Sequence, residues 1–460
     1  MPDTLSGPDV ALELDDIQGT VLRGRPNPYF GAYLIFEVED PTQSLILLER
    51  LLPHLTSAAD WQAPAENAWI NVVFSHEGLR RLGLDPDILA AFPLEVQQGM
   101  AARSEFLGDV GRSAPSEWVM PHALKGFHIA LHVMAGSPEL REAKLAVGHA
   151  ALSDLPGLKL IYRLDVGMPP TKREHFGFVD GLTRPFIVGQ GGEPLPGQTV
   201  SPPGEFVLGY HNAKGEISAG AGPSEFWRNG TYVSLRMIYQ DVALFRRFLR
   251  DNSDDEYAQE LLAAQMMGRW RSGCPMHHSP DRDQPELAKD PLKNNDFLYY
   301  DSDPQGRITP LGSHIRRANP RDGLKDSISD VDLHVLLRRG SAYGPVLPEG
   351  QLEDDGVDRG LVLAVINAFP ARQFEFVQSQ WINNGDFIAQ GDRTDPIIGR
   401  RDRADDFLVY QPHRHRVCGL AEFTTLRGGE HLFLPGLSGL RWLLDHLRQR
   451  QPETAPLKQD

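Results

Sequence analysis

The order of strand-like and helix-like segments over residues 29–166 most constrains what this chain can fold into. Runs of β-branched and aromatic residues alternate with runs whose apolar residues recur at helical spacing. The sequence predicts strands at Tyr29–Val38, Asn67–Phe74, Phe127–Met134 and Leu158–Val166, and helices at Ser44–Leu55, Glu77–Leu84 and Pro138–Leu152. Pro53 is expected to end or kink the first helix. The order β-α-β-β-α-β is that of a ferredoxin-like unit, in which two helices pack on one face of an antiparallel sheet.

The second half of the chain repeats this theme with longer insertions. The predicted strands are Thr231–Tyr239, Leu333–Leu337, Leu361–Ile366 and Gly419–Leu426, and the predicted helices are Val242–Leu249, Pro370–Trp381 and Leu437–Leu447. The two halves share an order of elements but no obvious sequence repeat. We therefore predict an α+β fold of two ferredoxin-like halves, with antiparallel sheets and helices packed on them.

Irregular stretches suggest where the parts of the chain meet. Gly189–Gly222 is dense in glycine and proline, which is typical of a linker or covering loop. Gly273–Pro310 is too long for a simple connection and indicates a functional cover. The expected parts are an N-terminal half at 1–190, a linker or covering loop at 191–225, a C-terminal half at 226–450 and a polar tail at 451–460.

Charge and cysteine content exclude several classes of protein. The 46 basic and 62 acidic side chains give a formal charge of −16, which disfavours nucleic acid and anionic membrane surfaces as partners. No apolar run is long enough to span a bilayer, so no membrane partner is expected. Two cysteines, Cys274 and Cys418, supply neither a disulfide framework nor a cysteine-rich metal site. The start of the chain shows no signal peptide or twin arginine, so a cytoplasmic location is expected. The sequence does not predict the oligomeric state.

Most of the 16 histidines suggest no special chemistry. The pairs His277-His278 and His413/His415 lack the i, i+4 spacing and carboxylate company of a zinc helix, so we interpret them as loop residues. No nucleophile elbow, phosphate-binding loop or dinucleotide fingerprint occurs, which removes the usual sequence support for hydrolases, phosphoryl transfer and nicotinamide chemistry.

Three short segments attract attention when they are taken together. Gly177–Gly181 flanks Asp180 with glycines, which allow a tight bend and close approach of the backbone to a flat ligand. His314 lies at the start of a basic helical segment, and Arg338 lies where an apolar strand reaches a turn. Taken singly, these are a turn residue, a helix start and a surface ion-pair partner.

In this order the three segments resemble those of the dye-decolourising peroxidases, a family of haem proteins. Gly177–Gly181 matches the family's Gly-x-x-Asp-Gly pattern, His314 the proximal haem ligand and Arg338 the distal arginine. The resemblance extends over nearly the whole chain through the stretches LDDIQGTVLRG, MMGRWRSGCP, NNDFLYYDSDPQG and RQFEFVQSQW. The family has two ferredoxin-like halves, which agrees with the element order.

The resemblance implies haem b as cofactor, held mainly by the C-terminal half, and reduction of hydrogen peroxide with oxidation of phenols or bulky dyes. His314 would ligate the iron, Gly181 would lie against the haem, Asp180 would move a proton and Arg338 would stabilise charge. An ordinary Asp titrates near pH ~3.9, so activity should favour acid unless burial raises this pKa. Three arginines close to His314 in sequence are candidates to meet the haem propionates: Arg316, Arg317 and Arg321.

The hydrogen-bond partner of the other His314 ring nitrogen stays open at this stage. Glu375 and Asn367 are candidates, and acidic residues in the loops are further ones. Compact family members carry Asn two positions after the distal arginine, where this chain has Gly340, and this difference and the long insertion suggest one of the larger subgroups. Tyr343 and Trp381 are candidate surface radical sites for bulky donors, with packing aromatics as the alternative.

Two other functions remain to be weighed against a peroxidase. A haem-binding or haem-handling protein would use the same residues to hold haem, with only incidental peroxidase activity. A ferredoxin-like interaction module would bind no cofactor at all. Asp180 and Arg338 discriminate, because a haem carrier has little use for a distal acid and arginine.

Overall fold

Eight strands form one antiparallel sheet to which both halves of the chain contribute. The computed structural model describes residues 11–59, 67–402 and 404–450. The strand order is β4-β1-β3-β2-β12-β7-β9-β8. The strands are β1 Phe30–Val38, β2 Ala68–Ser75, β3 Ile129–Ala135, β4 Leu158–Gly167, β7 Thr231–Gln240, β8 Leu337–Tyr343, β9 Gly360–Asn367 and β12 Thr424–Leu434.

Each half has the strand order of a ferredoxin-like unit. In the N-terminal half the order is β4-β1-β3-β2, and in the C-terminal half the corresponding fourth, first, third and second strands give β12-β7-β9-β8. Every pair of neighbours in the sheet is antiparallel. The predicted α+β fold of two ferredoxin-like halves is therefore confirmed, including the duplication of the element order.

The halves join at one short seam in the middle of the sheet. β12 pairs with β2 through Leu432 opposite Ser75 and Phe433 opposite Phe74. β4 and β8, the two outermost strands in the order, also contact each other, so the sheet curls until its ends meet. This curvature encloses an inner face that both halves share.

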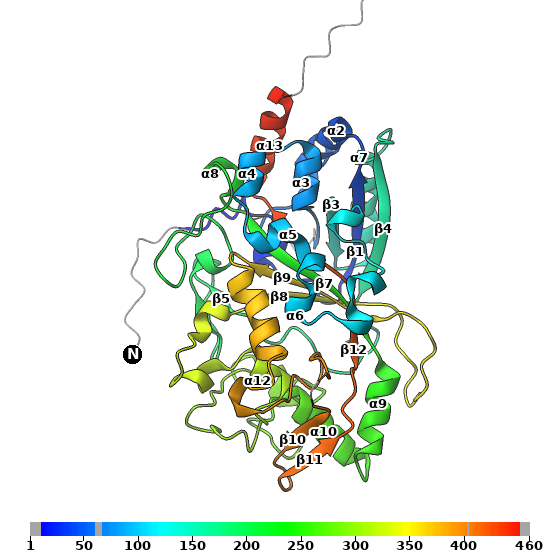
Figure 1. Cartoon of the computed structure of the whole chain (residues 1–460), viewed down its shortest axis with the longest axis vertical. Coiled ribbons are helices and arrows are strands. Elements are labelled where there is room, and N and C mark those ends of the chain that lie inside the picture. Colours follow the sequence, from blue (N-terminus) through cyan, green and yellow to red (C-terminus); the bar gives the residue numbers. More distant parts are fainter. Residues whose placement is uncertain (1–10, 60–66, 403, 451–460) are drawn as a thin grey trace, which may run out of the picture.

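Helices cover the outside of the curved sheet at two ends (Figure 1). α2, α3, α7 and α13 lie together beside the N-terminal strands, whereas α9, α10 and α12 lie at the opposite end with the β10–β11 hairpin. The longer helices are α2 Pro41–Leu51, α3 His76–Leu82, α5 Leu94–Ala102, α7 Pro138–Ala151, α9 Val242–Asp251, α10 Glu256–Met267 and α13 Leu437–Arg450. The shorter elements are α1 Gly19–Leu22, α4 Pro86–Ala90, α6 Ser104–Leu107, α8 Ser224–Trp227, α11 Pro285–Lys289, α12 His314–Ala318, β5 Phe186–Ile187, β6 Val200–Ser201, β10 Asp406–Val409 and β11 His415–Cys418.

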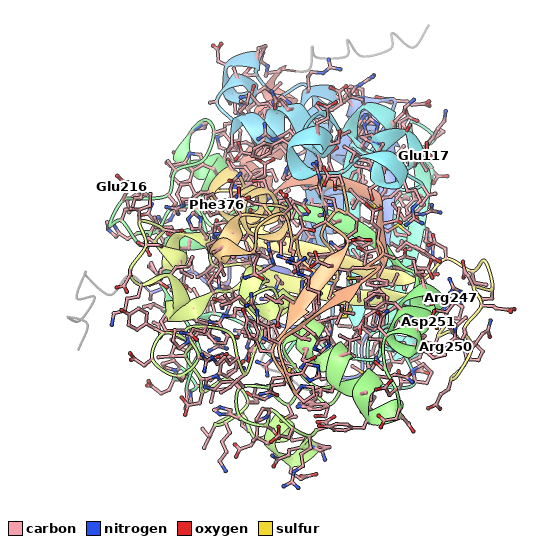
Figure 2. The ribbon with its side chains drawn as sticks, turned by 60° about the horizontal axis from the view of Figure 1, so that its bottom comes forward. Glu117, Glu216, Arg247, Arg250, Asp251 and Phe376 are labelled. Carbon is pink, nitrogen blue, oxygen red and sulfur yellow. The ribbon has the colours of Figure 1, made fainter. Side chains whose placement is uncertain are left out.

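Helix α9 illustrates how the sequence pattern sets which face is buried. Phe245 and Phe248 lie in a core cluster, whereas Arg250 and Asp251 on the same helix are exposed and paired with each other. Figure 2 shows Arg250 and Asp251 on this outer helix. The Asp241 side chain accepts a hydrogen bond from the Leu244 amide and caps the helix start. Within the described ranges, no helix combines the length and apolar character needed to cross a bilayer.

Two predicted strands of the second half are shifted along the chain. Leu333–Leu337 is wrong as a strand because Asp330 accepts a hydrogen bond from the Asp332 amide and winds Val331–His334 into a 3₁₀ turn, so β8 begins only at Leu337. Gly419–Leu426 is displaced because β12 continues to Leu434 through a bulge between Leu426 and Gly428. Two glycines in a strand interior weaken the sequence pattern there.

The remaining predicted segments agree with the structure apart from their ends and one helix type. α2 ends at Leu51 and Pro53 lies in the following 3₁₀ turn. The predicted helix Pro370–Trp381 is present as wide π-type turns over Ala371–Glu375 and Val377–Ile382. The glycine-rich segment 191–225 contains β6 and the first two residues of α8. The boundaries at 190, 225 and 450 stay a prediction, and the tail 451–460 lies outside the described residues.

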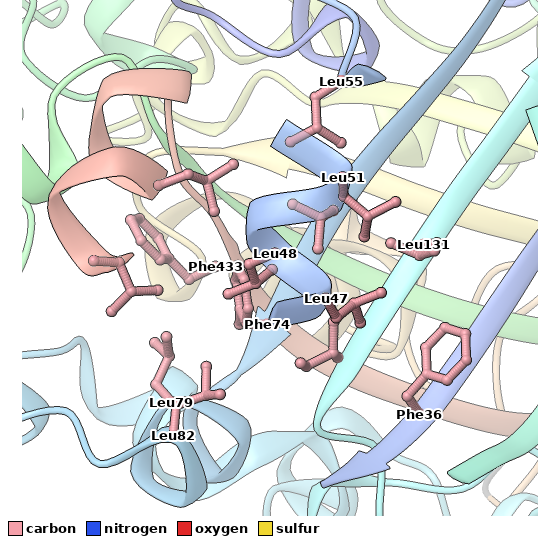
Figure 3. Close-up of a cluster of buried hydrophobic side chains, with 14 of the residues drawn as sticks. Phe36, Leu47, Leu48, Leu51, Leu55, Phe74, Leu79, Leu82, Leu131 and Phe433 are labelled. Carbon is pink, nitrogen blue, oxygen red and sulfur yellow. The ribbon is translucent and has the colours of Figure 1, made fainter. Parts of the chain in front are cut away.

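Aromatic rings pack around Phe433 at the seam between the halves, and Figure 3 shows Phe433 in the same buried apolar cluster as Phe74 and Leu48. Phe433 is fully buried, and its ring lies 5.5 Å from Phe92, 5.1 Å from Phe226 and 5.8 Å from Tyr232, measured between centroids. Phe92 and Phe226 come from opposite halves of the sequence. Because aromatic side chains bury large apolar areas, this cluster binds the two halves together as well as filling the core.

We expect Phe433→Ala to lower the free energy of unfolding by about 3–5 kcal/mol, because it leaves a large cavity at the seam. Equilibrium urea unfolding measures the loss. Leu124→Ala is the matched control, since Leu124 is 77% exposed and its truncation should change stability by less than about 0.5 kcal/mol. Equal stability losses in the two variants would contradict this account of the seam.

Candidate functional site

A cavity of about 450 Å³ lies between the C-terminal strands, the helical segments that cover them and the N-terminal residues 20–27. Apolar side chains provide much of its wall: Ile238, Leu361, Leu363 and Val365 from strands, and Phe374, Val377, Ile397 and Ile398 from other segments. Four of the predicted site residues line it together: Gly181, Asp180, His314 and Arg338. Tertiary structure thus gathers groups that lie up to 158 positions apart in the chain.

His314 is held from behind by a buried carboxylate. It is the first residue of α12, and its Nδ1 lies 2.9 Å from Oδ2 of Asp395, whose side chain is fully buried. The other Asp395 oxygen accepts hydrogen bonds from the Ile397 and Ile398 amides. An ionised Asp395 accepts a hydrogen bond from Nδ1–H, which leaves the Nε2 lone pair free to bind a metal.

The electrostatics of Asp395 support an ionised carboxylate. Burial by itself would raise the pKa of Asp395, but the facing His314 ring and the two backbone amides together hold that pKa below its ordinary value. A carboxylate of this kind orients the imidazole and increases its basicity.

The two named candidates for the His314 partner are wrong. Glu375 binds Arg103 and His431 instead. The Asn367 amide donates to the carbonyls of Tyr232 and Val365 within the sheet. The partner is a loop acid, the third class that the sequence left open, and no local pattern marks Asp395 among the acidic loop residues.

The glycine-flanked segment presents Asp180 to the cavity on a tight loop. Glu174 accepts hydrogen bonds from the Phe176 and Phe178 amides and from the Gln240 side chain, which anchors the loop to β7. Gly181 has φ +85°, a conformation that residues with a Cβ atom rarely adopt. The Asp180 side chain is 38% exposed and lines the cavity.

Arg25, which the sequence analysis missed, is the direct partner of Asp180. Its guanidinium lies 2.9 Å from Oδ2 of Asp180 and 4.5 Å above the Tyr29 ring. Arg25 follows the stretch LDDIQGTVLRG, so it lies in a segment that the resemblance covers, but no pattern assigns it a role. Burial works to raise the pKa of Asp180, whereas Arg25 and Arg338 together lower it, and the net result is a pKa below the ordinary value.

Arg338 extends from β8 toward the same acid. In the described part of the chain its guanidinium makes no hydrogen bond, so its donors are available to a ligand. Two positions later, a Cβ atom on Gly340 would lie 2.9 Å from Oδ2 of Asp180. Glycine at this position therefore leaves room for the Asp180–Arg25 pair.

The three arginines after His314 do not line the cavity. Arg316 pairs with Asp303 at 3.0 Å, Arg317 donates to main-chain carbonyls including that of Trp381 at 2.5 Å, and Arg321 donates to the carbonyls of Asn295 and Phe297. Their donors are taken up by these protein groups, and none of the three is among the lining residues of the described chain, so their contact with propionates stays a prediction that the cavity does not support. The cavity arginines besides Arg338 are Arg23, Arg25, Arg184, Arg269 and Arg339.

The two candidate radical residues are not at the surface. Tyr343 is 4% exposed and its hydroxyl donates to Asp358 at 3.1 Å. Trp381 is 2% exposed and stacks on Phe387. Both aromatic side chains are packed in the protein interior, so direct contact between either one and a bulky donor requires local opening.

The fold and the cavity together define an α+β enzyme built of two ferredoxin-like halves. The family model of the DyP dimeric alpha+beta barrel domain matches residues 16–154. A dye-decolorizing peroxidase of Mycena epipterygia is 31% identical over 94% of this chain and 87% of its own length, and Peroxidase 2 of Mycetinis scorodonius is 31% identical over 94% and 88%. The solved structure of an ancestral D-type dye decolorizing peroxidase superposes with a TM-score of 0.83 at 30% identity, covering 94% of this chain and 99% of that one.

These similarities extend along nearly the whole chain and agree in sequence and in fold. The chain belongs to the dye-decolorizing peroxidase family. It is accordingly an enzyme of the peroxidase class, as the resemblance predicted.

We expect Asp395→Ala to lower the free energy of unfolding by about 1–3 kcal/mol, since it leaves the Ile397 and Ile398 amides and the His314 ring without their buried acceptor. Urea unfolding of the haem-free protein measures this effect apart from cofactor binding. Asp386→Ala is the control, because Asp386 is an exposed carboxylate in the same part of the chain. A loss no larger than that of the control would show that Asp395 is not an essential acceptor.

Proposed function

We propose that this chain is a haem b-dependent peroxidase that reduces hydrogen peroxide and oxidises phenolic compounds and bulky dyes. One observation carries the proposal: a single cavity has a carboxylate-held histidine in one part of its lining and an Asp–Arg pair in another. The apolar residues between them suit the faces of a porphyrin. The donor set therefore fits haem.

In this proposal the cofactor is held from several directions. His314 would ligate the iron through Nε2, with Asp395 fixing the ring and raising its basicity. Gly181 allows the backbone to approach the ring closely. Arg184 and Arg269 line the cavity and are the cations that we assign to the propionates, replacing Arg316, Arg317 and Arg321.

When bound, haem would supply the iron centre that exchanges electrons with peroxide and with the donor. Asp180 would act as the general base and acid, taking a proton from one peroxide oxygen and delivering it to the other. Arg338 is always cationic and would stabilise negative charge on the departing oxygen. Arg25 would hold the Asp180 carboxylate in place and keep it ionised.

The ionisation of Asp180 sets the expected pH dependence. Its pKa lies below the ordinary value for aspartate, so the carboxylate is available as a base down to acidic pH. Activity should therefore persist in acid and decline only as the pH falls through this lowered pKa.

The central test compares three variants by absorption spectroscopy with hydrogen peroxide. We expect His314→Ala to lose the ferric Soret band, because its iron ligand is gone. Asp180→Asn and Arg338→Leu should keep haem but react with peroxide about 10²–10⁴-fold more slowly, the range typical of lost acid–base catalysis.

Other outcomes would reject parts of the proposal. Full haem occupancy with an unaltered spectrum in His314→Ala would contradict the ligand assignment. Bound haem with undiminished peroxide reactivity in both distal variants would contradict the peroxidase mechanism and favour haem handling. A colourless wild-type protein that never binds haem would reject the cofactor itself.

We expect Arg25→Gln to shift the acid limb of the kcat/KM profile for hydrogen peroxide to higher pH by about one unit. The reason is that removal of the guanidinium raises the pKa of Asp180, so the base protonates at higher pH. Arg25→Lys keeps the charge and is the control, with a smaller shift. An acid limb at the wild-type pH in Arg25→Gln would show that Arg25 does not govern Asp180.

The relay role of Tyr343 stays a prediction. The structure favours it over Trp381 only in one respect: the Tyr343 hydroxyl faces Asp358, which can accept the phenolic proton on oxidation. We expect Tyr343→Phe to slow turnover of a bulky anthraquinone dye while leaving oxidation of a small phenol unchanged. Unchanged dye turnover would reject the relay.

A further inference from the structure

The cavity extends beyond the Asp180–Arg25 pair into the inner face of the curled sheet. Its lining there comes mostly from the N-terminal half, from residues to which the proposed peroxidase reaction assigns no role. We call this part the inner lobe and define it by Arg23, Tyr33, Trp69, His132, Met134 and Arg339. Tyr33, Trp69 and Met134 belong to a core cluster that also contains Leu337 and Tyr343 of the C-terminal half.

The walls of the inner lobe are flat and polarisable. The Tyr33 and His132 rings are stacked, with centroids 4.6 Å apart and planes 16° from parallel. Trp69 lies opposite Met134 in the register of β2 and β3. Aromatic and thioether surfaces of this kind favour a planar ring as ligand.

One buried polar atom in the inner lobe has no partner. His132 is 8% exposed, and its Nε2 makes no hydrogen bond among the described residues. The Tyr33 hydroxyl on the neighbouring stacked ring also makes no hydrogen bond within the described chain, but this oxygen is accessible from the cavity. Because buried polar atoms are nearly always hydrogen-bonded, the unpaired Nε2 beside an open hydroxyl points to a ligand that completes them.

The protonation of His132 makes it a neutral partner. Burial lowers the pKa of His132 to about 4, so its ring carries no charge at neutral pH. The positive charge of the inner lobe therefore comes from its arginines alone.

Arginines outnumber carboxylates around the cavity. Asp180 and Glu174 are the two carboxylates that line it in the described structure, against six arginines. Asp180 is paired with Arg25, and Glu174 is engaged by backbone amides and Gln240. The surplus is unusual in a chain whose formal charge is −16.

Arg339 is one of the cavity arginines that no carboxylate of the described structure neutralises. Its guanidinium donates to the carbonyls of Thr20 and Val21 at the end of α1, and no carboxylate of the described structure pairs with it. Burial lowers the pKa of Arg339 to about 9, with further contributions from the nearby cations Arg184 and Arg25. Arg25 is paired with Asp180, and Arg184 is assigned to a propionate, so Arg339 is left without an anion, and an anion bound beside it would stabilise its charged form.

We propose that the inner lobe is a binding site for a small aromatic carboxylate. The ring would lie against Trp69, Met134 and the stacked Tyr33–His132 pair. The carboxylate would pair with Arg23 and Arg339, and a ring hydroxyl would hydrogen-bond to Tyr33. These residues line the same cavity as the proposed haem site, but none of them is assigned a part in the proposed haem chemistry.

The test is a calorimetric titration of 4-hydroxybenzoate onto the holoenzyme at neutral pH, without peroxide. The neutral isostere 4-hydroxybenzamide is titrated in parallel. We expect the carboxylate to bind at least tenfold more tightly than the amide, because only the carboxylate pairs with the arginines. Equal affinities, or no binding of the carboxylate, would overturn the proposal.

Variants then locate the binding. Tyr33→Phe removes one hydroxyl and keeps the ring, and we expect it to weaken 4-hydroxybenzoate binding about tenfold. Tyr257→Phe is the matched control, since Tyr257 is exposed and lies on α10 outside the cavity. Unchanged binding in Tyr33→Phe would overturn the assignment of the site.

A cyanide arm separates the inner lobe from the iron. Saturating cyanide should leave the affinity for 4-hydroxybenzoate unchanged. Loss of 4-hydroxybenzoate binding in the presence of cyanide would place the ligand at the haem and overturn the proposal. If Tyr33→Phe fails to fold, a crystal of the wild type is soaked with 4-hydroxybenzoate instead. Ligand density in the inner lobe would support the proposed site, and ligand density elsewhere would overturn it. An intact Soret band and normal peroxide turnover without benzoate binding would reject this site and leave the peroxidase function standing.

Discussion

The pairing of β12 with β2 is the constraint on which the rest of the molecule depends. It fuses two ferredoxin-like halves into one sheet, and contact between β4 and β8 curls that sheet until its ends meet. Aromatic packing around Phe433 stabilises the seam from the helix side. Because the sheet is continuous and curled, the N-terminal residues 20–27 come to lie against the edge strand β8. This brings Arg25 to the Asp180 loop and to Arg338.

The site sets each of two carboxylates beside a hydrogen-bond donor at short range. Asp395 faces His314 in one part of the cavity lining, and Arg25 faces Asp180 in another, so each titratable group has a partner that sets its orientation. Both carboxylates keep a pKa below the ordinary value although burial works against it, since close cations or hydrogen-bond donors outweigh the loss of solvation. The same cavity carries further arginines without a carboxylate partner, among them Arg338 and, in the inner lobe, Arg339.

Much of the fold could be predicted because its signals are local. Strand and helix periodicity correctly located the four strands and the helices α2, α3 and α7 of the N-terminal half and the order of the strands in the C-terminal half, but missed α4, α5, α6 and α10. The predictions failed where tertiary context overrode the pattern: Asp330 winds a short 3₁₀ turn in place of a strand, and a bulge at Gly428 carries β12 through two glycines. The approximate sites of Asp180, His314 and Arg338 followed from a resemblance, and the structure brings these residues to one cavity.

What the sequence by itself determined is the architecture and the identity of the groups that stand in characteristic local patterns. Glycines around Asp180 and the alternation of apolar residues are properties of neighbouring positions, so they can be recognised without a structure. Only the tertiary structure decided the partners: Asp395 over Glu375 and Asn367 for His314, Arg25 for Asp180, and the exclusion of Arg316, Arg317 and Arg321 from the cavity. The physical reason is that charge pairing and burial depend on distances across the curled sheet. Residues that are far apart in the sequence can be close across this sheet, so the sequence separation of two residues does not predict whether they pair.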